Sequence, residues 1–235
     1  MNILFLKMGG IGSRFNDGLG GLPKQFVEVD GTPLFCCILQ EYIATGLFSR
    51  FVLATNKDYL SLTQDLVKKF FPGEHIDIIL GGSTGAETIR NGVMFIKSFA
   101  SDNDILFIHD ATNPIILSKY FPEFIKECES NDAVTVVREM VHAVFNIDEE
   151  GYVFKNVDKK KIVSNYTPEL YVFKKVYEIY SSVTEEELST SVSSIDMAIR
   201  HNCKIKTIKK SFPDIKITYK EDLEYYKAIA DAKLG

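Results

Sequence analysis

The chain has 235 residues and a net charge of −5, with 46% hydrophobic and 25% charged residues. These values are ordinary for a folded globular protein and exclude a disordered chain. The length suits one large α/β domain, with or without a small projecting arm. An acidic chain binds nucleic acid poorly, so we expect no nucleic-acid partner and a phosphate site made only by a local group of cations.

Short apolar segments alternate with segments of helical periodicity along the first part of the chain. The predicted strands cover residues 3–8, 51–55, 76–80, 105–108 and 133–137. The predicted helices lie near 34–46, 58–70, 86–99 and 118–130, and Thr84 with Glu87 has the spacing of a capping box that starts the third helix. Nearly continuous apolar strands between amphipathic helices indicate a mostly parallel sheet covered on both faces.

The pattern changes over residues 138–165. Two alternating segments, 141–147 and 152–157, flank a turn that contains Gly151, and no helix separates them. They therefore form an antiparallel hairpin and not a parallel crossover unit. We expect a β-arm within a single domain that spans residues 1–235. After residue 168 the alternation returns, with helices near 171–182, 193–201 and 220–233 and a strand at 204–208.

A glycine-rich segment, K-M-G-G-I-G-S-R-F over residues 7–15, follows the first strand. Such a turn lets backbone N–H groups approach an anion closely. Arg14 and Lys24 flank further glycines, and two cations joined by a bendable loop can close over a triphosphate. The dinucleotide fingerprint fails because Phe15 occupies the place of its third glycine, and no Gly-Lys-Ser/Thr of a Walker loop follows. A nicotinamide oxidoreductase is therefore disfavoured.

Five segments in this order resemble the cytidylyltransferases of the nucleotidyltransferase superfamily, and above all the methylerythritol-phosphate and ribitol-phosphate enzymes. They are G-G-x-G-x-R-F at 9–15 with P-K-Q-F at 23–26, G-G-S at 81–83 with E-T-I-R-N-G at 87–92, H-D-A at 109–111 with Pro114, V-D-K at 157–159 with T-P at 167–168, and D-I-K-I-T at 214–218 with E-D-L at 221–223. The resemblance covers nearly the whole chain. It implies a Rossmann-like fold of the glycosyltransferase-A type, with a mostly parallel sheet and a small antiparallel β-arm.

The resemblance also implies a nucleotide half of the site. Its catalytic cations would be Arg14, Lys24 and Lys216, which neutralise the triphosphate and the charge that develops during transfer. Its nucleotide-binding residues would be Met8, Gly9, Gly10, Gly12, Gly81, Gly82, Ser83, Thr88 and Asp110. The glycines at 81–82 would let a flat base approach the backbone, and Ser83 or Thr88 would bond its edge. From the residues alone, these would be a turn and a helix N-cap.

Asp110 ends a predicted strand of the parallel sheet, and ligands of such sheets bind beyond the carboxyl ends of the strands. Its carboxylate could hold Mg²⁺ or meet the ribose hydroxyls, and both roles stay open. We expect Mg²⁺ as the cofactor, bridging the triphosphate oxygens. His109 alternates to the other side of the strand and is interpreted as structural.

The acceptor half of the site, implied at Asp110, Met140, Lys159 and Thr167, departs from the family pattern. Glu139 and Met140 stand where the family has Asp-Thr, and Lys159 stands where it has an arginine, whose bidentate phosphate clamp lysine cannot reproduce. The segment 165–169 is N-Y-T-P-E instead of Q-T-P-Q, and the serine-rich segment 190–196 replaces T-D-D or T-D-E. These departures concern the acceptor more than the reaction.

The sequence therefore predicts a cytidylyltransferase that moves CMP from CTP onto a phosphorylated sugar alcohol, such as ribitol 5-phosphate or 2-C-methylerythritol 4-phosphate. The altered acceptor half favours a surface-polysaccharide precursor over the isoprenoid intermediate. A nucleotide-sugar glycosyltransferase would carry a D-x-D motif after a strand, whereas the D-N-D at 102–104 precedes one. A catalytically silent nucleotide-binding module is disfavoured because Arg14, Lys24 and Lys216 are all retained.

The predicted arm also suggests a homodimer. An isolated two-stranded ribbon is marginal in water, and apolar residues such as Phe145 and Phe154 would be exposed on it. In enzymes of the family the arm reaches the acceptor site of the partner chain, and Lys159 occupies the position that contacts the acceptor phosphate there. We therefore expect a second copy of the chain as partner.

The cysteines, the N-terminal segment and the lengths of the apolar runs indicate the cellular compartment of the protein. The cysteines Cys36, Cys37, Cys128 and Cys203 contain no C-x-x-C pair, so neither zinc nor a disulfide framework is favoured, and we expect free thiols in a reducing compartment. The segment 1–6 lacks the basic start and the cleavage site of a signal peptide. No apolar run approaches the roughly 20 residues of a membrane span. We expect a cytoplasmic protein without a membrane partner.

Overall fold

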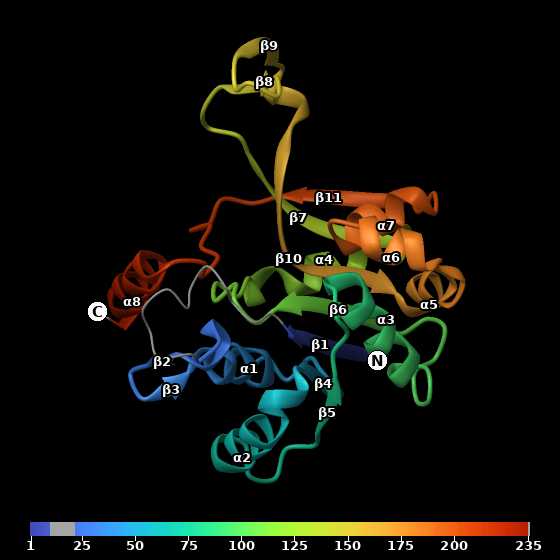
Figure 1. Cartoon of the computed structure of the whole chain (residues 1–235). Helices are drawn as coiled ribbons and strands as arrows, with labels where there is room; N and C mark the ends of the chain where they lie inside the picture. The colour runs from blue at the N-terminus through green and yellow to red at the C-terminus, as the bar shows by residue number, and fades with distance from the viewer. Residues whose placement is uncertain (10–21, 235) are drawn as a thin grey trace.

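The computed structural model describes residues 1–9 and 22–234 of the chain. A seven-stranded sheet in the order β11-β7-β10-β6-β1-β4-β5 forms its centre (Figure 1). The strands are β1 (Asn2–Met8), β4 (Arg50–Thr55), β5 (Ile76–Leu80), β6 (Ile105–Asp110), β7 (Ala133–Glu139), β10 (Val163–Val172) and β11 (Ile205–Lys209). Only β10 runs antiparallel to its neighbours β6 and β7, so the mostly parallel sheet is confirmed.

Helices cover both faces of the sheet, as predicted (Figure 1). They are α1 (Leu34–Ala44), α2 (Leu60–Phe70), α3 (Gly85–Ile96), α4 (Phe121–Glu127), α5 (Phe173–Ser182), α6 (Glu185–Thr190), α7 (Ser194–Arg200) and α8 (Lys220–Leu234). Alternate residues of β1 point to opposite faces. Leu4 and Leu6 belong to the buried cluster shared with α1, α2, α4 and α8, whereas Ile3 and Phe5 belong to the one shared with α3, α5, α6 and α7.

Short elements connect these layers. They are the 3₁₀ turns η1 (Lys24–Phe26), η2 (Lys57–Tyr59), η3 (Ser118–Tyr120) and η4 (Lys159–Lys161), and the small antiparallel pair β2 (Glu28–Val29) and β3 (Thr32–Pro33). None of the helices in the described part of the chain is both long and apolar enough to cross a membrane.

The antiparallel hairpin expected in the arm is present. Strands β8 (Val144–Ile147) and β9 (Val153–Val157) pair with each other and project from the end of the main sheet, between β7 and β10 (Figure 1). Phe145, Ile147, Val153 and Phe154 are all exposed on it. The arm therefore offers apolar surface that the single chain does not cover.

The prediction was wrong about the segment before α5. It placed a helix from about 171 and no strand ahead of it, whereas β10 extends to Val172 and α5 begins at Phe173. The polar residues Asn165, Thr167 and Glu169 hid this strand, because its place between β6 and β7 is visible only in the tertiary structure. The short helix α6, capped by Thr184, was also missed.

Candidate active site

A cavity of about 300 Å³ opens at the carboxyl ends of β1 and β6. This is where a ligand binds an open parallel sheet. Of the residues predicted for the nucleotide half, the lining contains Met8, Gly9, Lys24, Gly82, Ser83, Thr88, Asp110 and Lys216. Gly10, Gly12 and Arg14 lie outside the described residues. The fold thus gathers residues from both ends of the chain around one hollow.

One wall of the cavity is formed by Gly82, Ser83, Thr84, Gly85 and Thr88, whereas Gly81, also predicted for the site, does not line it. The N–H of Gly81 donates to the carbonyl of Thr55 at 2.8 Å, and that of Gly82 donates to Oγ1 of Thr88 at 3.0 Å. Gly82 has no room for a side chain, because a Cβ there would lie 2.5 Å from the Cβ of Glu87. The wall is therefore compact backbone, as the close approach of a flat ring requires.

The predicted capping box at the start of α3 is only half present. Thr84 caps the helix by accepting from the N–H of Glu87 at 3.1 Å. The Glu87 carboxylate, however, also accepts from the N–H and the hydroxyl of Ser83. These bonds from Ser83 hold the pKa of Glu87 below its ordinary value. A base that bonds the Ser83 hydroxyl would have to share it with Glu87.

Asp110 lies between two lysines. Nζ of Lys7 is 3.0 Å from Oδ1, and Nζ of Lys216 is 3.1 Å from Oδ2. Burial alone would raise the pKa of Asp110, but the charges of Lys7 and Lys216 outweigh it and hold the pKa well below its usual range. Asp110 is therefore a permanent anion at the floor of the cavity.

Lys24 is positioned by its neighbours in η1. The side chain of Gln25 donates to the carbonyl of Met8 at 2.7 Å, which ties the turn to the end of β1. Phe26 is buried, and its ring packs edge-on against Phe35 with centroids 5.7 Å apart. These anchors hold the turn that places Lys24 in the lining of the cavity.

Lys216 comes from the segment between β11 and α8. Its neighbour Ile217 is fully buried, and the N–H of Ile217 donates to the carbonyl of Thr112 at 2.8 Å. The N–H of Thr218 donates to the Asp222 carboxylate at 2.8 Å. Buried and hydrogen-bonded neighbours thus hold the backbone while the Lys216 side chain reaches Asp110.

His109 faces away from the cavity and has a structural role, as interpreted from the sequence. It is fully buried, its Nδ1 lies 2.9 Å from the hydroxyl of Tyr42, and its Nε2 lies 2.8 Å from the carbonyl of Asn113. Burial lowers the pKa of His109 to about 4. The ring is therefore neutral at neutral pH and braces β6 against α1.

The residues predicted for the acceptor half, apart from Asp110, do not join the cavity of the same chain. Lys159 is exposed on the arm, where its Nζ donates to the carbonyl of Val141 at 3.1 Å. Thr167 is buried in β10, and its hydroxyl has no hydrogen-bond partner among the described residues. Met140 is half-buried just beyond β7. The single chain gathers most of the described nucleotide-half residues at the cavity and leaves Met140, Lys159 and Thr167 outside its lining.

Two segments that depart from the family pattern meet in a buried polar network that the sequence analysis did not identify. Glu169 of β10 is 4% exposed and accepts from Asn165 at 2.6 Å and from the hydroxyl of Ser194. The hydroxyl of Thr135 bonds Asn165 in turn. Burial raises the pKa of Glu169, although the charge of Lys7 opposes this shift. The network places the Glu169 carboxyl group on the same face of the sheet as Lys7, but not in the lining of the cavity.

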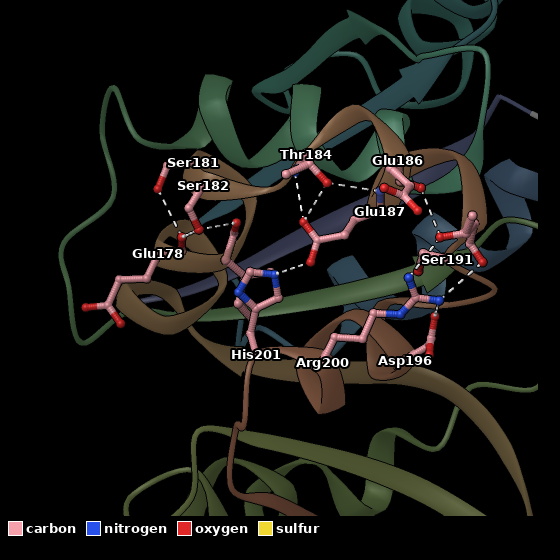
Figure 2. Close-up of polar contacts among 12 residues, drawn as sticks. Glu178, Ser181, Ser182, Thr184, Glu186, Glu187, Ser191, Asp196, Arg200 and His201 are labelled. Carbon is pink, nitrogen blue, oxygen red and sulfur yellow. Dashed lines mark hydrogen bonds and ion pairs between the residues drawn. The ribbon is translucent and has the colours of Figure 1, made fainter.

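The one acidic residue of the serine-rich segment 190–196, Asp196, has a structural partner. Asp196 pairs with Arg200 at 2.9 Å, and Arg200 donates to the hydroxyl of Thr190 at 2.9 Å (Figure 2). Nearby, Glu187 completes a capping box with Thr184 and lies 3.3 Å from His201 (Figure 2). These contacts stabilise the packing of α6 and α7, and Asp196 does not line the cavity.

Comparisons with known proteins show the family and the fold of the chain. The family model IspD, 2-C-methyl-D-erythritol 4-phosphate cytidylyltransferase, matches residues 3–232. Among solved structures, 4-diphosphocytidyl-2C-methyl-D-erythritol synthase from Anaerococcus prevotii is similar with a TM-score of 0.79 and 19% identity, over 98% of each chain. The 2-C-methyl-D-erythritol 4-phosphate cytidylyltransferase of Francisella tularensis has a TM-score of 0.79 and 19% identity, over 97% of this chain and 98% of that one.

The corresponding enzyme of Thermus thermophilus has a TM-score of 0.73 and 15% identity, over 98% of this chain and all of that one. At these identities the solved structures show the fold, whereas the family model covers almost the entire sequence. The chain therefore belongs to the 2-C-methyl-D-erythritol 4-phosphate cytidylyltransferase family of nucleotidyltransferases.

Proposed function

We propose that this chain transfers CMP from CTP to the phosphate of 2-C-methyl-D-erythritol 4-phosphate, the acceptor that names its family. The observation that carries the proposal is the cavity at the ends of β1 and β6. It combines a compact glycine wall with Lys24 and with Lys7 and Lys216, which both pair with the Asp110 carboxylate. A flat base beside a cluster of cations is the arrangement that a nucleoside triphosphate requires.

The transfer needs positioning and charge stabilisation more than it needs a protein nucleophile. An oxygen of the acceptor phosphate, already ionised at neutral pH, forms the new bond to the α-phosphorus of CTP. The bond from that phosphorus to the oxygen bridging to the β-phosphate breaks, and pyrophosphate leaves with the electron pair. Lys24 and Lys216 neutralise the charge that spreads over the phosphate oxygens, and Arg14 is proposed to act with them.

The described residues fit a magnesium ion held mainly by the substrate. Mg²⁺ in such sites is bound by phosphate oxygens, water and one or two carboxylates. Asp110 is the one carboxylate among the described lining residues, and it is already paired with Lys7 and Lys216. No group of three or more His, Cys, Asp or Glu side chains in the described ranges is placed to hold a metal ion. When bound, Mg²⁺ would supply charge neutralisation to the triphosphate, with Asp110 as a single protein ligand at most.

We further propose that the working unit is a homodimer. The arm exposes apolar residues such as Phe145 and Phe154, and Lys159 lies on the arm and not at the cavity of its own chain. A two-fold interface buries the same patch on both subunits. In that dimer Lys159 would complete the acceptor site of the partner subunit.

The acceptor is the element of the proposal that an assay decides. The family model favours methylerythritol phosphate, whereas the altered residues at 139–140, 159 and 165–169 had favoured a surface-polysaccharide precursor. The protein is incubated with CTP, Mg²⁺ and either 2-C-methyl-D-erythritol 4-phosphate or ribitol 5-phosphate, and pyrophosphate release is followed. We expect the higher kcat/KM with methylerythritol phosphate and no turnover in excess chelator. A preference for ribitol 5-phosphate would overturn the acceptor assignment, and no release with any polyol phosphate would overturn the reaction.

A further inference from the structure

Lys7 is the cation of the cavity that the reaction above does not use. It is the penultimate residue of β1, in which Ile3, Leu4, Phe5 and Leu6 are fully buried. By the alternation of the strand, Lys7 projects to the same face as Ile3 and Phe5. A lysine in such a strand is unfavourable unless its charge is compensated, so its presence calls for a partner or a ligand.

The first partner of Lys7 is Asp110, which Lys7 shares with Lys216. The carboxylate of Asp110 contacts both Lys7 and Lys216, at 3.0 Å and 3.1 Å. Two ammonium groups on one carboxylate leave one positive charge in excess at the floor of the cavity. The side chain of Lys7 is only 18% exposed, against 54% for Lys216, so Lys7 is the more firmly placed of the two.

The second acidic neighbour of Lys7 does not neutralise it by contact. Glu169 lies on the same face of the sheet and influences Lys7 electrostatically. Its oxygens, however, accept from Asn165 and Ser194, and the ion pairs of the described residues do not include a Lys7–Glu169 pair. Glu169 thus favours a protonated Lys7 without contacting it, and the Lys7 side chain lines the cavity.

We infer that Lys7 is a further phosphate-binding residue, which contacts an oxygen of the α-phosphate of CTP together with Lys216. The inference rests on the proposed function. A phosphate oxygen supplies the negative charge that the Lys7–Asp110–Lys216 cluster lacks. The α-phosphate is the fitting group because Lys7 immediately precedes Met8 and Gly9, which line the nucleotide half, and shares its carboxylate with Lys216. A charge-assisted bond at this atom also strengthens as negative charge develops on it during transfer.

The test compares Lys7→Met, which keeps the length of the side chain and suits a buried strand, with Lys7→Arg, which keeps the charge. We expect Lys7→Met to lower kcat about 10²-fold and to weaken CTP binding about tenfold in calorimetry. Lys7→Arg should recover part of both. Lys175→Met is the matched control, because it removes a lysine that pairs with Glu178 on α5, away from the cavity. It should behave as the wild type.

A double variant separates phosphate binding from mere charge compensation. If Lys7 only balances the buried carboxylate of Glu169, then Lys7→Met combined with Glu169→Gln should regain wild-type kcat and CTP affinity, and that result would overturn the inference. We expect the double variant to stay impaired, whatever stability it recovers. Wild-type affinity for CTP in Lys7→Met would equally overturn it. If the wild type binds CTP but releases no pyrophosphate, the proposed acceptor reaction fails, whereas weaker CTP binding by Lys7→Met would still support the role of Lys7.

Discussion

The nucleotide half and the acceptor half of this site are built in different ways. Most of the described residues predicted for the nucleotide half line one cavity, and hydrogen bonds to β1, β4 and α3 hold its walls. The predicted acceptor residues Met140, Lys159 and Thr167 do not line this cavity, and the arm that carries Lys159 projects from the sheet (Figure 1). One parallel sheet thus gathers most of the residues predicted for the nucleotide half into a single cavity, whereas we propose that a second chain completes the acceptor half.

The largest effect should come from removing a cation of the nucleotide half. We expect Lys24→Ala, and equally Arg14→Ala, to lower kcat about 10²-fold or more, the scale of one lost transition-state charge contact. The thermal midpoint should hardly change, because Gln25 and Phe26 anchor the turn that carries Lys24. Pyrophosphate release and scanning calorimetry measure the two quantities. The control is Lys68→Ala, which removes an exposed lysine of α2 and should keep wild-type activity. If both Lys24→Ala and Arg14→Ala retained more than half of the wild-type activity, the assignment would be contradicted.

A smaller effect, confined to one substrate, should come from the acceptor half. Lys159→Ala should raise the KM for the acceptor phosphate about tenfold, because a charge-assisted phosphate bond is lost, and leave the KM for CTP unchanged. Steady-state kinetics with each substrate varied in turn measure both constants. Lys161→Ala removes a neighbouring exposed lysine of η4 as a control. A raised KM for CTP alone would place Lys159 in the nucleotide half instead.

The smallest effect on activity is expected at His109, which supports the nucleotide half from the opposite face of β6. Its pKa is about 4 when folded, below the ordinary 6.5. The neutral ring therefore contributes stability that is full above pH 6.5 and is lost as the pH falls towards 4, about 3 kcal/mol in total. His109→Gln should remove that part of the pH dependence in urea unfolding between pH 7 and pH 4. Equal pH dependence in both proteins would show that His109 does not titrate as described.

The fold and the nucleotide half were predictable because their signals are local. Apolar strands, a glycine segment next to Lys24, and the G-S-T turn before α3 each identify themselves within a few residues. Lys7 was missed because a lysine near a strand end is usually solvated, and its partner Asp110 follows only in β6. A charged residue breaking an otherwise apolar strand was the signal that could have found it.

The acceptor half could not be predicted to the same depth because its residues depend on tertiary pairing. Glu169 is the clearest example, since a glutamate in a polar segment suggests an exposed turn. Its burial follows only when β10 inserts between β6 and β7 and Ser194 of α7 closes over it. Only the arm and Lys159 support the prediction that the acceptor site is shared between two chains.

Complementation between two impaired variants, assayed with the acceptor well below its KM, tests the division of the site most directly. Lys24→Ala protein is mixed in equal amounts with Lys159→Ala protein, and pyrophosphate release is measured after subunit exchange has been demonstrated. If each site takes Lys24 from one chain and Lys159 from the other, every mixed dimer has one intact site, and random pairing restores roughly a quarter of the wild-type activity. No recovery after proven exchange, or a strict monomer in light scattering, would contradict the account and show that one chain builds the whole site.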